Sequence, residues 1–478
     1  MGETVTMTDE YDLIVLGGGP VGENVADRAV QGGLTAVIVE AELVGGECSY
    51  WACMPSKALL RSPQALRAAR QVGGAAEAIT GDLDVRAVLD RRDSFTSHRQ
   101  DDGQVAWLES AGIDLVRGHG RLSGERKVAV TLPDGRVRTL TARHAVAIST
   151  GSDAAIPPIP GLHEANPWTS REATSAEEIP ASLVVIGGGV VAVEMATAYA
   201  SLGAEVTVLA RSGLLGSVEP FAGELVAEGL RGLGVDVRTG VVTKSVSRDA
   251  DGVTVTTDSG DVRAAEILVA TGRVPRSGDI GLETVGLAAG RYIRTDDTLQ
   301  VPGVDWLYAV GDVNGRVLLT HQGKYQARGA GDVIAARAKG EPVDDDRWGR
   351  HVATADHAAV PQVVFGEPEI AAVGLTEAAA REAGHRVRAV EVEFSSVAGA
   401  SLHADGYRGR AHMVVDEERQ VLLGVTMVGS DVAELVHAAT IAVVGEVPLA
   451  RLWHAVPSYP TMSEVWLRLL EAYGRQSA

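Results

Sequence analysis

The sequence is poor in cysteine and has no long apolar run, and each shortage narrows the class of protein. No apolar run reaches the ~20 residues that span a bilayer, and the N-terminus lacks a signal-peptide pattern. Only two cysteines occur among 478 residues. We therefore expect a cytoplasmic protein that spans no membrane. In that reducing compartment a disulfide is more often catalytic than structural.

The sequence also lacks an excess of basic residues. Lys and Arg number 43 against 63 Asp and Glu, which gives a formal net charge of −20. This charge argues against a general attraction to nucleic acid or to an anionic membrane, although a local basic pocket remains compatible with it. The hydrophobic share of 45% and the charged share of 22% are typical of a globular protein. The length predicts two to four domains.

The two cysteines, Cys48 and Cys53, lie close together in the segment GGECSYWACMPSK, residues 45–57. Five residues of ideal helix rise ~7.5 Å, whereas a disulfide needs Cα atoms about 4.4 to 6.8 Å apart. A bridge between these cysteines therefore requires a distorted turn. A small strained ring has a relatively oxidising potential and opens readily to a flavin or a thiol. Two buried structural thiols are the alternative interpretation.

A glycine-rich turn precedes the cysteines in the order strand, turn, helix, strand. Residues 11–16 form an apolar strand, GGGPVG follows it, and residues 36–40 form the second strand. Gly17 makes the turn, Gly19 lets the backbone approach a pyrophosphate, and Gly22 packs the helix on the strand. Glu40 ends the second strand, where it can bind a ribose hydroxyl. The segment therefore predicts a dinucleotide site.

The same unit recurs over residues 183–212, so a second dinucleotide is expected. Its second strand ends in Ala210-Arg211-Ser212 rather than in an acid. A carboxylate there would repel the 2′-phosphate of NADP, whereas a guanidinium holds it with two hydrogen bonds. NADPH is therefore favoured over NADH, which remains possible. The alternative interpretation of Arg211 is a solvated charge just past a strand.

Further strands end in glycine where a cofactor could meet them, at residues 145–151, 267–273 and 307–312. The chain resembles one protein family over essentially its full length. The resemblance rests on these segments, on the two glycine-rich units, on the Cys-x4-Cys-x-Pro-Ser-Lys pattern and on the closing YPTMSE of residues 459–464. The family is that of the FAD-dependent pyridine nucleotide:disulfide oxidoreductases, which include lipoamide dehydrogenase, glutathione reductase and mercuric reductase.

The resemblance implies an α/β fold with two Rossmann-like dinucleotide-binding domains, for FAD and NAD(P), and a C-terminal α+β dimerisation domain. The expected boundaries are 8–160 for the first part of the FAD domain, 161–275 for the NAD(P) domain, 276–348 for the second part of the FAD domain, and 349–478 for the dimerisation domain. A homodimer is the implied assembly.

The resemblance also implies which residues bind the two cofactors. FAD is expected on the first fingerprint, with Asp312 near its ribityl and diphosphate groups, and NAD(P)H on the second. The expected cofactor-binding residues are Gly17, Gly19, Gly22, Glu40, Gly46, Thr150, Gly151, Gly311, Asp312, Thr320, His321, Gly187, Gly189, Ala192, Arg211, Ser212, Gly272 and Arg273. No metal ligands are expected.

By the same resemblance, Cys53 faces the flavin as the charge-transfer thiol, and Cys48 exchanges with the substrate. Lys57 lies by the flavin and pairs with Glu194. A helix starting near Thr320 helps to stabilise negative charge on the flavin. A thiolate at Cys53 is favoured near positive charge.

The closing motif departs from the disulfide-reducing relatives, in which a histidine manages the proton of the interchange thiol. Here the position is Tyr459, whose ordinary pKa is ~3.5 units above that of histidine. Neutral Tyr459 donates a hydrogen bond but is a poor general base near pH 7. Glu464, the expected orienting acid, is retained. His454, five residues upstream, is the alternative base.

The chain has no third cysteine, which argues against mercury reduction, because mercuric reductase needs a C-terminal cysteine pair. The leading expectation is an enzyme that reduces a small disulfide or another thiol-reactive acceptor with NAD(P)H, FAD and the cysteine pair. The alternatives are an NAD(P)H:quinone-type reductase in which the flavin reduces its acceptor directly, lipoamide dehydrogenase-like activity, and a non-enzymatic FAD-binding subunit. The sequence does not name the acceptor.

Overall fold

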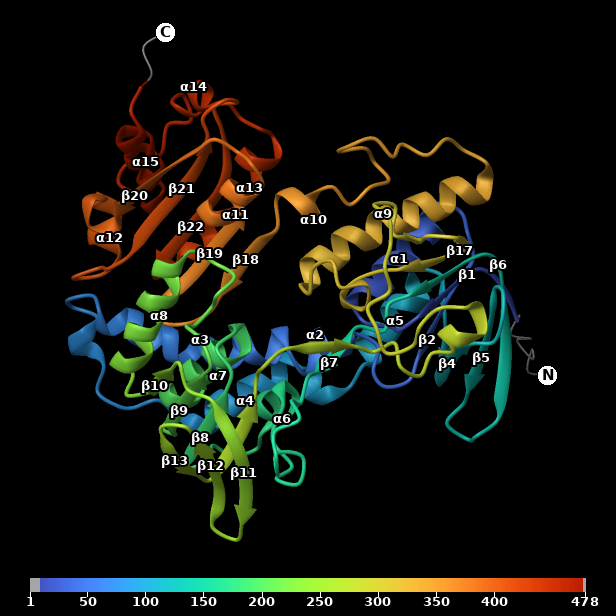
Figure 1. Ribbon diagram of the computed structural model, residues 1–478, viewed down its shortest axis with the longest axis horizontal. Coiled ribbons are helices and arrows are strands. Elements are labelled where there is room, and N and C mark those ends of the chain that lie inside the picture. Colours follow the sequence, from blue (N-terminus) through green and yellow to red (C-terminus); the bar gives the residue numbers. More distant parts are fainter. Residues whose placement is uncertain (1–8, 476–478) are drawn as a thin grey trace. The chain divides into compact units, whose positions relative to one another are not determined.

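The computed structural model describes residues 9–475 (Figure 1). These residues divide into two compact units. The first comprises residues 9–55, 93–154 and 273–356, and the second comprises 56–92, 155–272 and 357–475. The four-segment division expected from the sequence remains a prediction, and its outer limits, residues 8 and 478, lie outside the described residues.

The first unit is built on a largely parallel sheet in the order β16-β17-β6-β1-β2-β3, with β5 and β4 added beside β6. The strands β17, β6, β1, β2 and β3 run parallel. Their residues are almost wholly apolar where they are buried on both faces, as in 13–16 of β1. The strands of this unit are β1 (Glu10–Leu16), β2 (Ala36–Glu40), β3 (Ile113–Arg117), β4 (His119–Leu122), β5 (Lys127–Thr131), β6 (Val137–Ile148), β7 (Ser152–Ala154), β15 (Arg273–Pro275), β16 (Gln300–Val301) and β17 (Val304–Ala309).

Two helices, α1 and α9, pack against each other and cover one face of this sheet (Figure 1). Their close contact depends on small residues, because a Cβ on Gly331 of α9 would lie 2.5 Å from the Cβ of Arg28. The helices that begin in this unit are α1 (Pro20–Gln31), α2 (Gly46–Tyr50), α3 (Cys53–Arg70), α5 (Asp102–Ser110), α9 (Thr320–Lys339) and α10 (Ala355–Ala358), with the 3-10 turns η2 (Ser97–Arg99), η3 (Leu282–Val285) and η4 (Asp312–Asn314).

The second unit contains a parallel sheet in the order β10-β9-β8-β14 and an antiparallel meander, β11-β12-β13. Helix α7 is apolar on nearly all sides and is buried against the parallel sheet. These elements are β8 (Ser182–Ile186), α7 (Val190–Ser201), β9 (Glu205–Ala210), α8 (Pro220–Gly232), β10 (Asp236–Thr239), β11 (Thr243–Asp249), β12 (Gly252–Thr257), β13 (Gly260–Ala264) and β14 (Glu266–Val269), together with η1 (Ala76–Ala78), α4 (Val85–Phe95) and α6 (Ser170–Ser175).

The C-terminal part of the second unit is an antiparallel sheet in the order β18-β19-β22-β21-β20. Helix α13 packs on β22 and β19, and α15 packs on β20 and β21. The strands are β18 (Pro361–Val364), β19 (Glu369–Gly374), β20 (Val387–Glu393), β21 (Arg410–Asp416) and β22 (Val421–Gly429), and the helices are α11 (Glu377–Glu382), η5 (Phe394–Ser396), α12 (Ala398–His403), η6 (Val432–Leu435), α13 (Val436–Val444), α14 (Leu449–Leu452), η7 (Met462–Glu464) and α15 (Val465–Tyr473). The predicted α/β fold with a separate C-terminal α+β part is confirmed.

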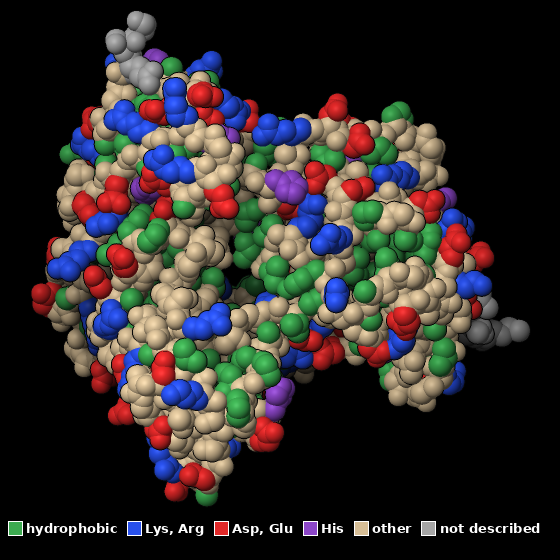
Figure 2. Space-filling view, in the orientation of Figure 1, with side chains coloured by type: hydrophobic (Ala, Val, Ile, Leu, Met, Phe, Trp, Pro, Cys, Tyr) green, Lys and Arg blue, Asp and Glu red, His purple; other side chains and the backbone are tan. Residues whose placement is uncertain are grey.

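The surface carries charges of both signs. On the face drawn in Figure 2, Lys and Arg side chains are interspersed with Asp and Glu side chains and form no extended basic area. Among residues 9–475, no helix combines the length and the apolar character that crossing a membrane requires.

Candidate active site

The first glycine turn joins β1 to α1 and fits a dinucleotide. Gly17 has φ +100°, which favours glycine, and a Cβ on Gly22 would lie 1.9 Å from the carbonyl oxygen of Gly17. Gly19 is the N-cap of α1 and offers no capping side chain. The first amide groups of α1 can therefore bind a pyrophosphate. Glu40, at the end of β2, accepts the backbone N–H of Gly18 at 2.6 Å.

The two cysteines lie on different helices, with a break in the backbone between them. Cys48 is in α2, and Cys53 is the first residue of α3. Between them the backbone of Trp51 leaves the helical region, with φ −136° and ψ 0°. Gly46 has φ +56°, and a Cβ on it would lie 2.8 Å from the Cα of Gly19. Because Gly45 and Gly46 have no side chains, the cysteine turn can lie close to the first glycine-rich turn.

Cys48 and Cys53 are both partly buried, and no disulfide joins them in the structure. The Cys53 sulfur lies 3.3 Å from the hydroxyl oxygen of Thr320, the first residue of α9. The hydrogen bond with Cys53 raises the pKa of the Cys48 thiol well above its usual value, and burial adds to the rise, whereas Thr320 and Lys324 oppose it. The rise at Cys48 is therefore due mainly to its neighbour Cys53, because two thiolates side by side disfavour each other.

Lys57 and Glu194, both in the second unit, form an ion pair with Nζ 2.7 Å from Oε2. The other oxygen of Glu194 accepts the backbone N–H of Phe365 at 3.1 Å. The Lys57 ammonium also lies 5.0 Å from the centre of the Phe365 ring. Since the Glu194 side chain is only 4% exposed, the lysine is held in place at its charged end. Lys57 lies four residues, or one helical turn, beyond Cys53 on α3.

A third group of predicted residues gathers at the ends of β6 and β17. The Ser152 hydroxyl donates to the Asp312 carboxylate at 2.5 Å, and Arg273 donates to the Ser152 hydroxyl oxygen at 2.6 Å. Thr150 donates to the carbonyl oxygen of Arg276 at 2.6 Å. Arg273, expected beside Gly272 at a cofactor, is therefore placed with Asp312 in the first unit. Gly151 and Gly311 both have positive φ, and His321 is the exposed second residue of α9.

The second glycine turn repeats the geometry of the first. A Cβ on Gly187 would lie 2.2 Å from the carbonyl oxygen of Ala270, and Gly189 is the N-cap of α7 without a capping side chain. Ala192 is fully buried in α7. Arg211 and Ser212 follow β9 and are exposed. A basic side chain thus stands at the strand end next to the turn, where it can meet a bound nucleotide.

The closing motif is only partly assembled within one chain. Tyr459 is 75% exposed and precedes a cis proline. Glu464 is buried, and its Oε1 accepts from Arg468 at 2.6 Å. The other oxygen of Glu464 is buried without a hydrogen bond to any described residue. His454 is exposed after α14. Within the described chain, therefore, neither His454 nor Tyr459 is hydrogen-bonded to Glu464.

Sequence reasoning missed several residues that hold the predicted ones. Ser152 binds Asp312, and its position directly after the Thr150-Gly151 strand end was a usable signal. Phe365 binds Glu194 and faces Lys57 from 171 residues beyond Glu194, and no pattern indicated it. Gln326 of α9 accepts the backbone N–H of Gly311 at 2.9 Å. Within residues 9–475, no group of three or more His, Cys, Asp or Glu side chains is arranged to hold a metal ion.

Comparison with known proteins identifies the family. The family model described as pyridine nucleotide-disulphide oxidoreductase matches residues 11–328, and the dimerisation domain of that family matches residues 360–470. Dihydrolipoyl dehydrogenase of Chlorobaculum tepidum is 32% identical and covers 97% of both chains. Mercuric reductase of Shigella flexneri is also 32% identical, over 95% of this chain and 79% of its own length.

Solved structures show the same fold. The HOCl-induced flavoprotein disulfide reductase RclA from Escherichia coli, as a Cu(II) complex, has a TM-score of 0.83 over 97% of this chain and 99% of its own, at 23% identity. LpdA from Mycobacterium tuberculosis has a TM-score of 0.81 at 25% identity, over 96% of this chain and 98% of its own. The chain therefore belongs to the pyridine nucleotide-disulphide oxidoreductase family and is a flavoprotein enzyme that uses FAD and NAD(P)H.

Proposed function

We propose that this enzyme passes electrons from NADPH, through FAD and the Cys48–Cys53 pair, to a small disulfide or another thiol-reactive acceptor. The observation that carries the proposal is the turn between α2 and α3. It brings two cysteines within hydrogen-bonding contact and sets Cys53 against the first residue of α9. A pair of structural thiols would need neither the break at Trp51 nor a hydroxyl partner at a helix start.

The residues of the first fingerprint fit FAD. The uncapped start of α1 suits the pyrophosphate, and Glu40 suits the ribose. We assign Asp312, held by Ser152 at 2.5 Å, to the ribityl and diphosphate region. Gly46, Thr150, Gly151, Gly311, Thr320 and His321 complete the proposed site. When bound, FAD accepts a hydride from NAD(P)H and supplies the electron pair that opens a neighbouring disulfide.

The residues of the second fingerprint are assigned to NADPH. The uncapped start of α7 suits a second pyrophosphate, with Gly187, Gly189 and Ala192 forming the turn and its helix. Arg211 and Ser212 are exposed at the end of β9 and are proposed to hold the 2′-phosphate. A guanidinium forms two parallel hydrogen bonds with a phosphate. We propose NADPH as the preferred donor, with NADH as the weaker alternative.

The cysteine pair then carries out two thiol–disulfide exchanges. Two electrons and two protons convert the Cys48–Cys53 disulfide into two thiols. Cys48 as a thiolate attacks an acceptor disulfide, forms a mixed disulfide and releases the first product thiol. The Cys53 thiolate attacks Cys48, releases the second product thiol and restores the disulfide. Cys53, which lies against the start of α9, is proposed as the thiolate beside the cofactor.

Lys57 and Thr320 have distinct proposed roles near the cysteine pair. Lys57, fixed by Glu194, supplies a positive charge one turn from Cys53. Thr320 contributes a hydroxyl and the start of α9, whose N-cap has no side chain to bind the free amides. Both features favour negative charge next to Cys53.

We further propose that a second copy of the chain completes the site. The exposed Tyr459 would donate a hydrogen bond at the partner's Cys48, with the unpaired oxygen of Glu464 behind it. The matched dimerisation domain supports this arrangement. We also propose the cytoplasm as the compartment, because in that reducing environment a disulfide is usually transient and catalytic.

The acceptor is tested by steady-state assays of the purified enzyme. With NADPH in excess, turnover is measured with small disulfides, including lipoamide, with quinones, and with Hg²⁺ as a negative comparison. We expect disulfide turnover that Cys48→Ser abolishes, whereas quinone turnover survives the same change. Quinone turnover in the absence of any disulfide turnover would favour the quinone reductase alternative, in which the cysteines do not carry the electrons to the acceptor.

A further inference from the structure

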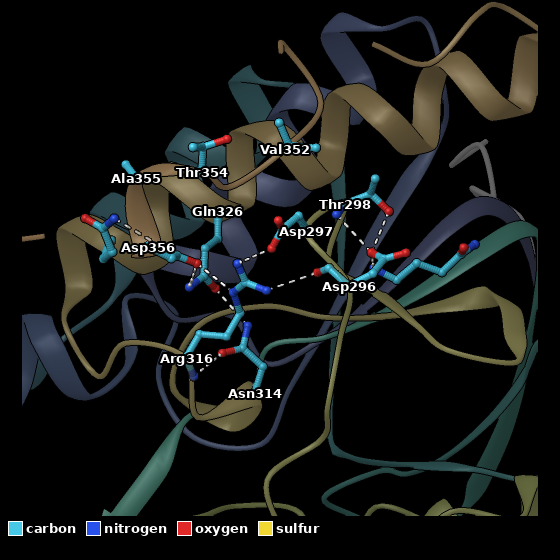
Figure 3. A network of polar contacts seen from close by, with 12 residues as sticks. Asp296, Asp297, Thr298, Asn314, Arg316, Gln326, Val352, Thr354, Ala355 and Asp356 are labelled. Carbon is cyan, nitrogen blue, oxygen red and sulfur yellow. Dashed lines mark hydrogen bonds and ion pairs between the residues drawn. The ribbon is translucent and has the colours of Figure 1, made fainter. Parts of the chain in front are cut away.

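A buried ion pair joins Arg316 to Asp356 in the first unit (Figure 3). Arg316 Nε lies 2.7 Å from Asp356 Oδ2, and the two side chains are 12% and 1% exposed. Arg316 also donates to Asp297 at 2.7 Å and to the carbonyl oxygen of Asp296 at 3.2 Å. Burying two charges has a desolvation cost that their attraction barely offsets. A gain in folding stability alone therefore does not account for the buried ion pair of Arg316 and Asp356.

Asp356 is also the acceptor for two glutamines of α9. Gln322 donates to Oδ1 at 3.1 Å, and Gln326 donates to Oδ2 at 3.0 Å. Both glutamines are buried, and they stand one turn apart on the same helix. The amide oxygens of Gln322 and Gln326 have different surroundings, so the roles of the two glutamines can be separated.

The amide oxygen of Gln326 reaches the turn that carries Asp312. It accepts the backbone N–H of Gly311 at 2.9 Å and the side-chain amide of Asn314 at 2.8 Å. A glutamine amide has one oxygen and one NH₂ group. Because Asp356 accepts from the NH₂ group, the oxygen must face Gly311 and Asn314. The Asp356 carboxylate therefore determines which end of the Gln326 amide faces the turn. Figure 3 shows Gln326 beside Asp356 and Arg316.

Within the turn, the backbone N–H of Asn314 donates to the carbonyl oxygen of Gly311 and that of Gly315 donates to the carbonyl oxygen of Asp312, each at 3.0 Å. The N–H of Gly311 is bonded to Gln326 instead. Gly311 has φ +80° and ψ −155°, a conformation that favours glycine. Its successor, Asp312, faces Ser152 and Arg273 on the opposite side. Arg316, which holds Asp356, is tied by its own backbone N–H to Asn314 at 2.9 Å. The contacts form a closed ring around the turn.

We propose that Asp356 and Gln326 are positioning residues that hold the Gly311–Asp312 turn in the conformation that binds FAD. Neither side chain is proposed to touch FAD. The inference rests on the assignment of Asp312 to the FAD site, which the proposed function includes. A carboxylate, an amide and a backbone N–H thus form a relay of fixed hydrogen bonds from a buried ion pair to the cofactor site.

The test compares two matched variants, Gln326→Met and Gln322→Met, as holoenzymes. Both remove a buried amide that donates to Asp356, but only the first removes the acceptor of the Gly311 N–H. Release of FAD is followed by the rise in flavin fluorescence after dilution, and the visible circular dichroism of bound FAD reports its surroundings. We expect at least tenfold faster release and an altered dichroism spectrum for Gln326→Met, and less than a threefold change with an unaltered spectrum for Gln322→Met.

Two further variants separate the possible failures. Asp312→Asn tests the assignment of Asp312, and unchanged FAD release in that variant would refute the assignment itself. If Asp312→Asn speeds release but the two methionine variants match each other, the positioning role is wrong. Asp356→Asn combined with Gln326→Met should speed release no more than Gln326→Met alone, because both changes break one relay. Additive effects on release would overturn the relay.

Discussion

Arg211 is the single residue on which the choice of nicotinamide cofactor depends. Its side chain is exposed at the end of β9. Loss of a charge-assisted contact with the 2′-phosphate costs ~1.5 to 3 kcal/mol. We predict that Arg211→Ala raises the Kd of NADPH by about tenfold or more and leaves that of NADH nearly unchanged. Arg238→Ala, on the neighbouring strand β10, is the control and should affect neither; equal losses for both nucleotides in Arg211→Ala would remove the basis for NADPH.

Glu23, in the first turn of α1, makes a separate prediction about stability. Burial raises its pKa to about 7, Glu40 adds to the rise, and Lys324 opposes it. Its Oε1 is buried and accepts no hydrogen bond from the described residues. Because the folded pKa exceeds the usual 4.5, the folded state holds the proton more tightly, and this contribution to stability is lost as the pH rises through about 7.

We therefore expect Glu23→Gln to lessen the fall in the free energy of unfolding between pH 4.5 and 8, by at most about 3 kcal/mol. The measurement is urea unfolding of both proteins across that range. Asp27→Asn, one turn further along α1, serves as the control substitution. A wild type and Glu23→Gln variant with parallel stability profiles would show that Glu23 titrates normally.

Among the elements, the turn between α2 and α3 determines how the two thiols differ. Cys53 begins α3 and lies against Thr320, whereas Cys48 remains in α2. We predict that Cys53→Ser abolishes the long-wavelength charge-transfer absorption of the enzyme. Cys48→Ser should retain it at rest, since Cys53 can then no longer form the disulfide and, in the proposed site, stays reduced beside the flavin. Each variant is the control for the other, and identical spectra in the two would show that the pair never couples to the flavin.

Elements with a strong local signal were predictable from sequence, and their partners were not. The two glycine turns, the start of α9 at Thr320 and the broken helix between the cysteines follow from glycine spacing, apolar runs and disulfide geometry. The contacts of Asp312 with Ser152 and of Glu194 with Phe365 join residues more than 100 positions apart. No local pattern encodes such pairs, because they depend on how the sheets are assembled. The contact of Gln326 with Asp356 spans only 30 residues, but it also depends on tertiary packing and was missed.

At the scale of the whole molecule, the exposed Tyr459 predicts a dependence on the dimer. If it donates a hydrogen bond in the partner's site, Tyr459→Phe should lower turnover with the natural acceptor. Tyr459→His should raise turnover with ordinary disulfides, because histidine is a base near neutral pH. The control is quinone turnover, which should be unaffected by either change. Wild-type disulfide turnover as fast as that of Tyr459→His would instead indicate His454 or another group as the base.

Dilution tests the same assembly without a substitution. A monomer should retain FAD, because the first unit supplies the proposed residues of that site, yet lose disulfide turnover. We expect specific activity to fall as the protein is diluted below the dissociation constant of the dimer, measured in parallel by sedimentation. Constant activity through the monomer range would contradict a site shared between two copies.

The most direct test of the electron path through the whole enzyme is an anaerobic titration with dithionite. The account requires two stores, FAD and the Cys48–Cys53 disulfide, each holding two electrons. The oxidised enzyme should therefore take up four electrons per chain, with a charge-transfer band that grows as the first two enter and falls as the second two reduce the flavin. Uptake of only two electrons, with no such band, would show that the cysteine pair lies outside the path from NADPH to the acceptor.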